Sequence, residues 1–216
     1  MFEPRTITAE DADRTKQYQG EAQRKDLLSS VTDMDSYLES LKMEAIISEF
    51  TAADAPRIAQ LINKTNQFNL TTRRRTEGEV HALIRDESYV CFSVRLKDRF
   101  GDHGLISVFI AQQNASTLRI DTWLMSCRVL KRQVEDEVLN ELARLARNRC
   151  CVGLEALYLP TPKNKMVRDF YLQMGFNIAR EDEQVREFEL AISNLQPRLT
   201  KIKVTRRAYE PIRSDS

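Results

Sequence analysis

The stretch IDTWLMSCRVLKRQVE, from Ile120 to Glu135, decides the fold. Its first residues have the apolar pattern of a buried strand, and after Cys127 the spacing of apolar residues becomes helical. Three cations, Arg128, Lys131 and Arg132, stand between the strand and the helix. A tight turn that opens a helix presents free backbone N–H groups and the positive end of the helix dipole to an anion. The stretch therefore predicts a phosphate or pyrophosphate site beside a thiol.

The composition is that of an ordinary globular protein, with 42% apolar and 30% charged residues in a chain of 216. This length allows one sizeable core and a small appendage. The net charge of +1 gives no reason to expect nucleic acid or a membrane as a partner, and there is neither a membrane-length apolar run nor a signal-peptide pattern. The four cysteines lack the CxxC spacing of a zinc site. We expect a cytoplasmic protein with reduced thiols and no metal.

The chain divides into three parts by composition. Residues 1–43 are polar and helix-prone, which predicts a helical arm or linker. Residues 44–196 predict a compact domain, and the basic residues 197–216 predict a solvated tail in which KIKV can add one strand. Residues 11–15, DADRT, match the DxDxT pattern of aspartate-nucleophile phosphatases. No buried strand precedes them, so we assign no phosphatase activity.

The pattern of residues 44–196 predicts the element order β-α-α-β-β-β-α-β-α-β-β. Three strands are expected at 88–98, 103–113 and 117–127, a helix at 133–148, a strand at 153–160, a helix at 161–174 and a closing hairpin at 177–192. This order resembles the GNAT acyltransferase fold, an α/β fold. It has a mixed central sheet, opened at one point, with helices on both faces. In that fold the turn at Cys127 holds the pyrophosphate of coenzyme A.

A second resemblance to GNAT proteins lies near the C-terminal end of the domain. The residues Asn164, Val167, Phe170, Tyr171 and Gly175 stand at the spacing of a GNAT signature. The resemblance implies an Asn at the pantetheine and a Tyr beside the thiol. Tyr171 can then donate a proton to a departing thiolate, because a phenol is a donor with a pKa near 10. The alternative is that Tyr171 packs in the core.

Four longer sequence segments resemble a narrower family, the C-terminal acyltransferase half of FkbH-like proteins. They are NKTNQFNLTTRR (63–74), DRFGDHGLIS (98–107), DTWLMSCRVLKRQVE (121–135) and PTPKNKMVRDFY (160–171). This resemblance implies a domain that moves a glyceryl-type or similar short acyl group to or from the phosphopantetheine thiol of an acyl carrier protein, in polyketide-type secondary metabolism. Full-length members add a haloacid-dehalogenase-type phosphatase, so a separate phosphatase of that type is an expected partner.

The loop after the thiol departs from the GNAT pattern R-x-x-G-x-G. Here the residues are Arg128-Val129-Leu130-Lys131-Arg132-Gln133, and both glycines are replaced. We expect free coenzyme A to bind less well for this reason. Arg128, Lys131 and Arg132, with Asn164, can instead bind the phosphate of a carrier-attached arm through charge-assisted hydrogen bonds.

Cys127, His103 and Asp102 are the other candidates for catalysis. A thiol at a helix N-terminus beside Arg128 is expected to have a depressed pKa and to carry the acyl group as a thioester. The alternative is a buried cysteine of the strand. His103 or Asp102 can deprotonate an incoming thiol, since the pKa of histidine suits that task. The alternative is a turn aspartate beside a surface histidine.

The polar loop before the arginine run is the candidate acyl pocket. Its amides and hydroxyls can hydrogen-bond a hydroxylated acyl group, and the alternative is a self-capped loop. The residues are Asn63, Thr65, Asn66, Gln67, Phe68 and Asn69. Arg73, Arg74 and Arg75 either form a solvated face or dock an acidic carrier protein.

We expect an acyltransferase that acts on carrier-bound short acyl groups, through a Cys127 thioester. Two other functions stay open. One is an acetyl-CoA-dependent N-acyltransferase, which intact loop glycines would have favoured. The other is a non-catalytic module that docks a carrier protein. The sequence leaves open the acyl group, its donor and the oligomeric state.

Overall fold

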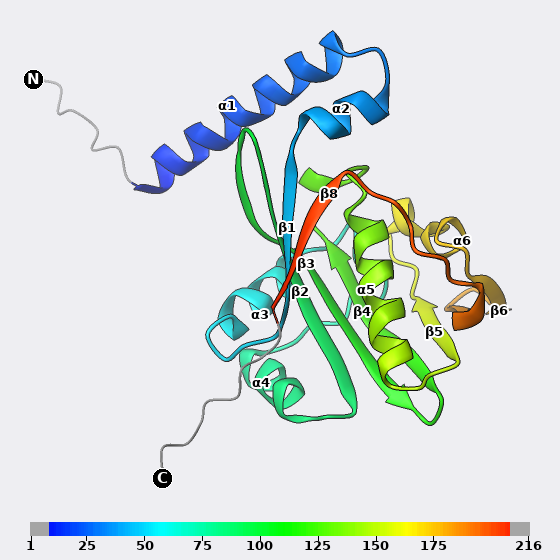
Figure 1. Ribbon diagram of the computed structural model, residues 1–216. Coiled ribbons are helices and arrows are strands. Elements are labelled where there is room, and N and C mark those ends of the chain that lie inside the picture. Colours follow the sequence, from blue (N-terminus) through cyan, green and yellow to red (C-terminus); the bar gives the residue numbers. More distant parts are fainter. Residues whose placement is uncertain (1–8, 208–216) are drawn as a thin grey trace, which may run out of the picture.

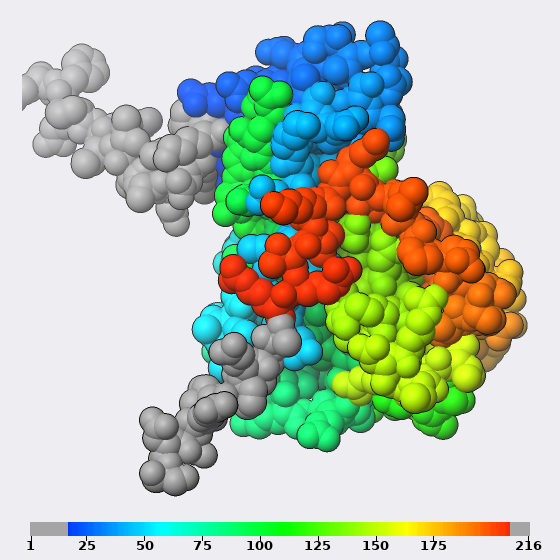
Figure 2. All heavy atoms as spheres, in the orientation of Figure 1, coloured from blue at the N-terminus to red at the C-terminus, as the bar shows by residue number. Residues whose placement is uncertain are grey.

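The computed structural model describes residues 9–207, and their side chains from residue 17 onward (Figure 1). The chain begins with the predicted helical arm, α1 (Ala9–Ser30) and α2 (Met34–Ser40). The DADRT segment is helical within α1. At Gly20, α1 lies against Phe100, at the tip of the hairpin formed by β2 (Tyr89–Asp98) and β3 (Gly101–Asn114). A Cβ at Gly20 would stand 3.1 Å from the Phe100 carbonyl oxygen. Figure 2 shows this hairpin tip in green beneath the blue of α1.

Within the described residues, eight strands form one mixed sheet in the order β6-β7-β5-β4-β3-β2-β1-β8. The pairs β1–β8 and β4–β5 are parallel, and the other neighbours are antiparallel. The extra strand near the C-terminus, the closing hairpin and the mixed sheet are therefore confirmed. The strands are β1 (Met43–Glu49), β2 (Tyr89–Asp98), β3 (Gly101–Asn114), β4 (Thr117–Met125), β5 (Gly153–Tyr158), β6 (Asn177–Glu181), β7 (Arg186–Ala191) and β8 (Ile202–Arg207).

Helices cover both faces of the sheet, as the sequence predicts. On one face, α3 (Ala55–Lys64) and α4 (Glu77–Arg85) bury Ile58, Ile62 and Val80 against apolar side chains of β3 and β4. On the other face, α5 (Val134–Asn148) packs its apolar stripe over Trp123 and Phe109 (Figure 1). Helix α4 begins with a capping box between Thr76 and Glu79. None of the described helices is long and apolar enough to cross a membrane.

The helix predicted over residues 161–174 is wrong. Only a 3₁₀ turn, η2 (Lys165–Val167), and one helical turn, α6 (Phe170–Gln173), form there. The fully buried Asn164 explains the break, because its side chain accepts from the Thr161 N–H and donates to the Leu159 carbonyl. These bonds hold the backbone in a turn instead of a helix. Gly175 follows α6 with φ +94°, the left-handed conformation that often ends a helix.

Candidate functional site

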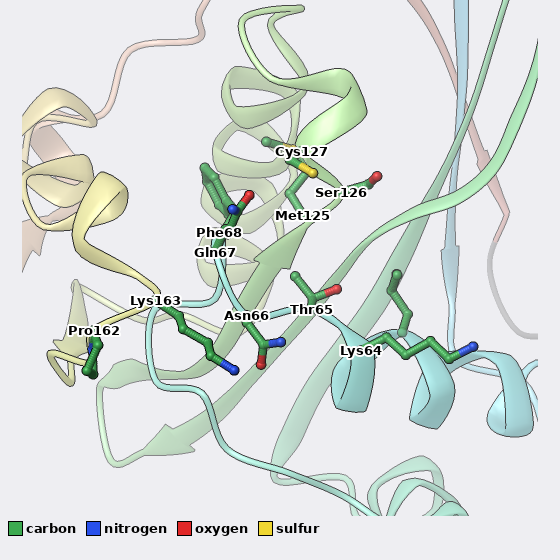
Figure 3. Close-up of a pocket in the computed structure, with 11 residues that line it drawn as sticks. Lys64, Thr65, Asn66, Gln67, Phe68, Met125, Ser126, Cys127, Pro162 and Lys163 are labelled. Carbon is green, nitrogen blue, oxygen red and sulfur yellow. The ribbon is translucent and has the colours of Figure 1, made fainter. Parts of the chain in front are cut away.

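A cavity of about 650 Å³ lies at the end of β4, and Cys127 is part of its wall. Figure 3 shows Thr65 and Asn66 between Lys64 on one side and Lys163 on the other, with Cys127 and Ser126 nearby. The predicted thiol thus meets part of the predicted acyl pocket. The lining residues are Leu61, Lys64, Thr65, Asn66, Gln67, Phe68, Met125, Ser126, Cys127, Pro162 and Lys163.

Two of the predicted pocket residues do not line this cavity. Asn63 instead makes both of its side-chain bonds to the backbone of Arg75. Asn69 is fully buried, and its side chain bonds to the Thr65 carbonyl and the Thr72 N–H. These two residues hold the loop in shape. Sequence reasoning missed Lys64 and Lys163, since a lysine in the last turn of a helix or in a surface loop carries no pattern of its own.

Cys127 is exposed, so the alternative of a cysteine buried in the strand is wrong. The thiol does not stand at the N-terminus of the long helix either. Cys127 begins a 3₁₀ turn, η1 (Cys127–Val129), and α5 starts only at Val134. The loop between them has extended backbone at Leu130. Cys127 is therefore open to the cavity and to solvent, and it does not lie at the N-terminus of α5.

The sheet opens between β4 and β5, and the chain itself fills the opening. These strands pair from Thr117 with Gly153 to Ile120 with Ala156, and then separate beyond a bulge at Asp121. The segment 68–70 lies in the gap. Its Phe68 carbonyl accepts from Met125 N at 3.0 Å and its Leu70 N–H donates to the Trp123 carbonyl at 3.3 Å, while the Leu70 carbonyl accepts from Leu159 N at 2.9 Å.

Two groups of side chains hold segment 68–70 in place. Asn164, predicted at the pantetheine, donates from Nδ2 to the Asn69 carbonyl at 3.0 Å. At the bulge, Arg73 and Arg75 both pair with the Asp121 carboxylate. Burial alone would raise the pKa of Asp121, but the hydrogen bonds from Arg75 and Thr122 outweigh it and lower the pKa. Arg73 and Arg75 are thus engaged within the chain.

The loop from Ser126 to Gln133 contains two residues with left-handed backbone. Lys131 and Gln133 stand where the GNAT pattern has glycine, and both are left-handed, with φ +62° and +64°. Alternating conformations of this kind turn successive N–H groups toward one anion. The Glu135 side chain already accepts from the Lys131 N–H at 3.3 Å. Glu135 is also the first of three consecutive acids in the first turn of α5.

Arg132 and His103 belong to a buried cluster beneath the arm. Asp98 Oδ2 lies 2.9 Å from His103 Nε2 and 3.3 Å from Arg132 NH1, and both Arg24 and Arg132 also approach Glu21. His103 is buried, so the alternative of a surface histidine is wrong. Neither His103 nor Arg132 lines the cavity.

The remaining predicted site residues are placed as follows. Asp102 is exposed and its carboxylate accepts from the Gly104 N–H, so it is not the partner of His103. Arg128 and Lys131 are exposed. Arg128 contacts Gln17 of the arm at 3.4 Å.

Tyr171 lies in the aromatic core with Trp123, Phe170 and Phe188. It is fully buried, and its hydroxyl has no hydrogen-bond partner among the described residues. Burial raises the pKa of this phenol, and the negative charge of Asp121 adds to the rise. Among the described side chains, no group of three or more His, Cys, Asp or Glu is placed to hold a metal ion.

Solved structures with a similar arrangement include N-acetyltransferases. The ribosomal-protein-S18-alanine N-acetyltransferase of Escherichia coli matches with a TM-score of 0.52 and 16% identity, over 72% of this chain and 98% of that one. The fold is the GNAT acetyltransferase fold. The GNAT domain of S. lividans PAT matches with a TM-score of 0.52 and 15% identity, over 67% and 89%. No family model and no curated protein sequence matches the chain.

Another solved structure of this fold is a complex with coenzyme A. The described residues of the present chain fit coenzyme A poorly. Spermidine N-acetyltransferase from Vibrio cholerae, in complex with CoA and spermine, has a TM-score of 0.52 and 12% identity, over 69% of this chain and 96% of that one. In this chain Glu135 bonds to the Lys131 N–H, and Arg132 is engaged with Asp98. Segment 68–70 fills the opening of the sheet. A pyrophosphate at this loop would therefore be repelled by the acidic side chains in the first turn of α5.

Proposed function

We propose that this chain is an acyltransferase that takes a glyceryl-type or similar short acyl group from the phosphopantetheine thiol of an acyl carrier protein. Cys127 carries the acyl group as a thioester. The observation that supports the proposal is the exposed Cys127 in the wall of a 650 Å³ cavity, opposite the amides and hydroxyl of Thr65, Asn66 and Gln67.

The proposed step is a thioester exchange. The Cys127 thiolate attacks the carbonyl carbon of the carrier thioester, the bond to the pantetheine sulfur breaks, and that sulfur leaves as a thiolate that takes a proton from solvent. Amide and hydroxyl side chains can hydrogen-bond the hydroxyls of a glyceryl group. Lys64 and Lys163 add positive charge to the cavity wall. A second exchange of the same kind passes the acyl group to an acceptor thiol.

A carrier-bound donor suits this surface better than coenzyme A. The carrier presents one phosphodiester at the base of its arm, whereas coenzyme A brings a pyrophosphate and a 3′-phosphate. Arg128 and Lys131 are exposed beside Cys127 and can pair with one phosphate and with acidic side chains of the carrier. A separate haloacid-dehalogenase-type phosphatase would supply the acyl group.

The test is to mix the protein with glyceryl-loaded carrier protein and to measure its intact mass. We expect the mass to rise by one glyceryl group in the wild type and in Cys150→Ser, which removes another exposed thiol. The gain should be absent in Cys127→Ser. If Cys127→Ser still gains the group, or if no variant gains it while the carrier binds, the thioester mechanism is wrong.

An acetyl-CoA-dependent N-acyltransferase is the second candidate. It is favoured by the N-acetyltransferases of the same fold and by the left-handed backbone kept at Lys131 and Gln133. Release of free coenzyme A from acetyl-CoA in the presence of amine substrates, unaffected by Cys127→Ser, would support it over the carrier reaction.

A further inference from the structure

The loop before α5 has backbone features of an anion-binding loop, and the carboxylate of Glu135 already contacts it. Left-handed residues at Lys131 and Gln133 expose N–H groups at the start of a 15-residue helix, where a phosphate would normally bind. The carboxylate of Glu135 lies over this position. Its Oε1 accepts from the Lys131 N–H at 3.3 Å, and the Glu135 N–H also bonds to the carboxylate.

The second carboxylate oxygen, Glu135 Oε2, shows that this carboxylate is only partly hydrogen-bonded. It is shielded from solvent and has no hydrogen-bond partner among the described residues. A buried acceptor without a partner is costly, so a carboxylate held there for stability alone would be expected to have one. Burial raises the pKa of Glu135, although the two N–H groups oppose the rise. The site thus holds its own anion in a position that is less than ideal for a carboxylate.

The side chains that neighbour Glu135 also disfavour an anionic ligand at this loop. Asp136 and Glu137 follow directly, and they are bound to Arg198 and Thr200, respectively. Arg132, which lies between the two left-handed residues, is 7% exposed and contacts Asp98. A pyrophosphate at this loop would therefore have to displace Glu135 and approach two further acids, without Arg132 as a partner.

We propose that Glu135 is a specificity-determining residue that occupies the anion-binding loop and excludes nucleotide-bearing thioesters. The donors that remain are thioesters without a nucleotide, of which a carrier-bound phosphopantetheine is one. This inference rests on the proposed function for its biological meaning. Its physical content, the exclusion of coenzyme A by one carboxylate, does not depend on chemistry at Cys127.

The experiment is isothermal titration of the full chain with coenzyme A, at low ionic strength. We expect the wild type to bind weakly, without saturation at about 1 mM, and Glu135→Ala to bind roughly tenfold more tightly or better, as removal of a like charge at a helix N-terminus allows. Glu135→Gln should gain less, since its amide still fills the loop. Asp136→Asn is the matched control, because it removes one charge from the same turn and leaves the Lys131 bond in place.

The titrations with coenzyme A test the exclusion by Glu135, and the loading of Cys127 tests the proposed function. Micromolar binding of coenzyme A by the wild type, or equal affinities of the wild type, Glu135→Ala and Glu135→Gln, would overturn the inference. An equal gain in Asp136→Asn would also overturn it, because the effect would then be the net charge of the turn. Failure of carrier loading at Cys127, together with a gain of affinity in Glu135→Ala, would refute the proposed function and leave the exclusion intact.

Discussion

Arg24 of the arm and Asp98 at the end of β2 form a bidentate ion pair. Arg24 Nε and NH2 donate to the two oxygens of Asp98 at 2.8 and 2.7 Å. The side chains are 5% and 0% exposed, so the pair lies out of water. His103 and Arg132 contact the same carboxylate. One buried charge thus joins the arm, the β2–β3 hairpin and the loop that follows Cys127.

Removing the arm's side of this pair should destabilise the whole chain. We expect Arg24→Ala to lower the free energy of unfolding by about 3 kcal/mol, because Asp98 loses its two shortest ion-pair bonds while buried. Lys25→Ala, next to it on the exposed side of α1, should cost less than about 0.5 kcal/mol. Urea denaturation followed by circular dichroism measures both. Equal effects of the two substitutions would contradict the role of Asp98.

Asp98 should also give the stability a pH dependence in acid. Burial opposes its charged form, but hydrogen bonds from His103 and Arg24 outweigh burial and hold its pKa far below the usual range. The folded pKa therefore lies below the unfolded value of about 3.9. The stabilisation is complete above about pH 5, one unit above the unfolded pKa, and is lost as the pH falls toward the folded pKa. The difference in unfolding free energy between wild type and Asp98→Asn should shrink as the pH falls from about 5 toward 2. A difference independent of pH would contradict this.

Much of the fold is predictable because its signals are local. The apolar spacing gives β4 and α5 within two residues of their observed ends, as 117–127 and 133–148 against Thr117–Met125 and Val134–Asn148. The R-x-x-G-x-G register likewise marks Lys131 and Gln133, the two left-handed positions of the loop. Such features are encoded by residues close in sequence.

The parts that the sequence does not reveal depend on contacts between distant residues. Asn164 reaches Asn69, 95 positions away, and Arg24 reaches Asp98, 74 positions away. Neither contact leaves a periodic pattern. The helix over 161–174 is wrongly predicted for the same reason. The helical spacing of its apolar residues does not reveal that the Asn164 side chain bonds to backbone groups that a helix would pair. The self-filled opening between β4 and β5 follows from these long-range contacts.

Asn164 should control how firmly segment 68–70 is held. We expect Asn164→Ala to lower the free energy of unfolding by about 2–3 kcal/mol, because the buried carbonyls of Asn69 and Leu159 lose their donor. Amide hydrogen exchange of residues 66–72 should accelerate as well. Asn177→Ala, at an exposed position of β6, serves as the control. Unchanged exchange in this segment would show that Asn164 does not hold it.

Tyr171→Phe tests the proton-donor role predicted for that phenol. The hydroxyl is buried without a described partner, so its removal should leave the free energy of unfolding unchanged or raise it by up to about 1 kcal/mol. We expect the rate of acyl loading on Cys127 to stay the same, since Tyr171 does not line the cavity. A large fall in that rate at unchanged stability would instead support the proton donor.

His103→Gln distinguishes a general base from a structural histidine. A base that deprotonates a thiol would give the loading rate an acid limb set by its own titration, and the substitution would remove that limb. The structure places His103 with Asp98 and Arg132, outside the cavity wall. We therefore expect His103→Gln to lower the free energy of unfolding by about 1–3 kcal/mol and to leave the shape of the pH–rate profile unchanged. Asp102→Asn, at the exposed neighbour, should change neither quantity. A profile that loses its acid limb in His103→Gln alone would make His103 the base, and would require the arm to move before the reaction.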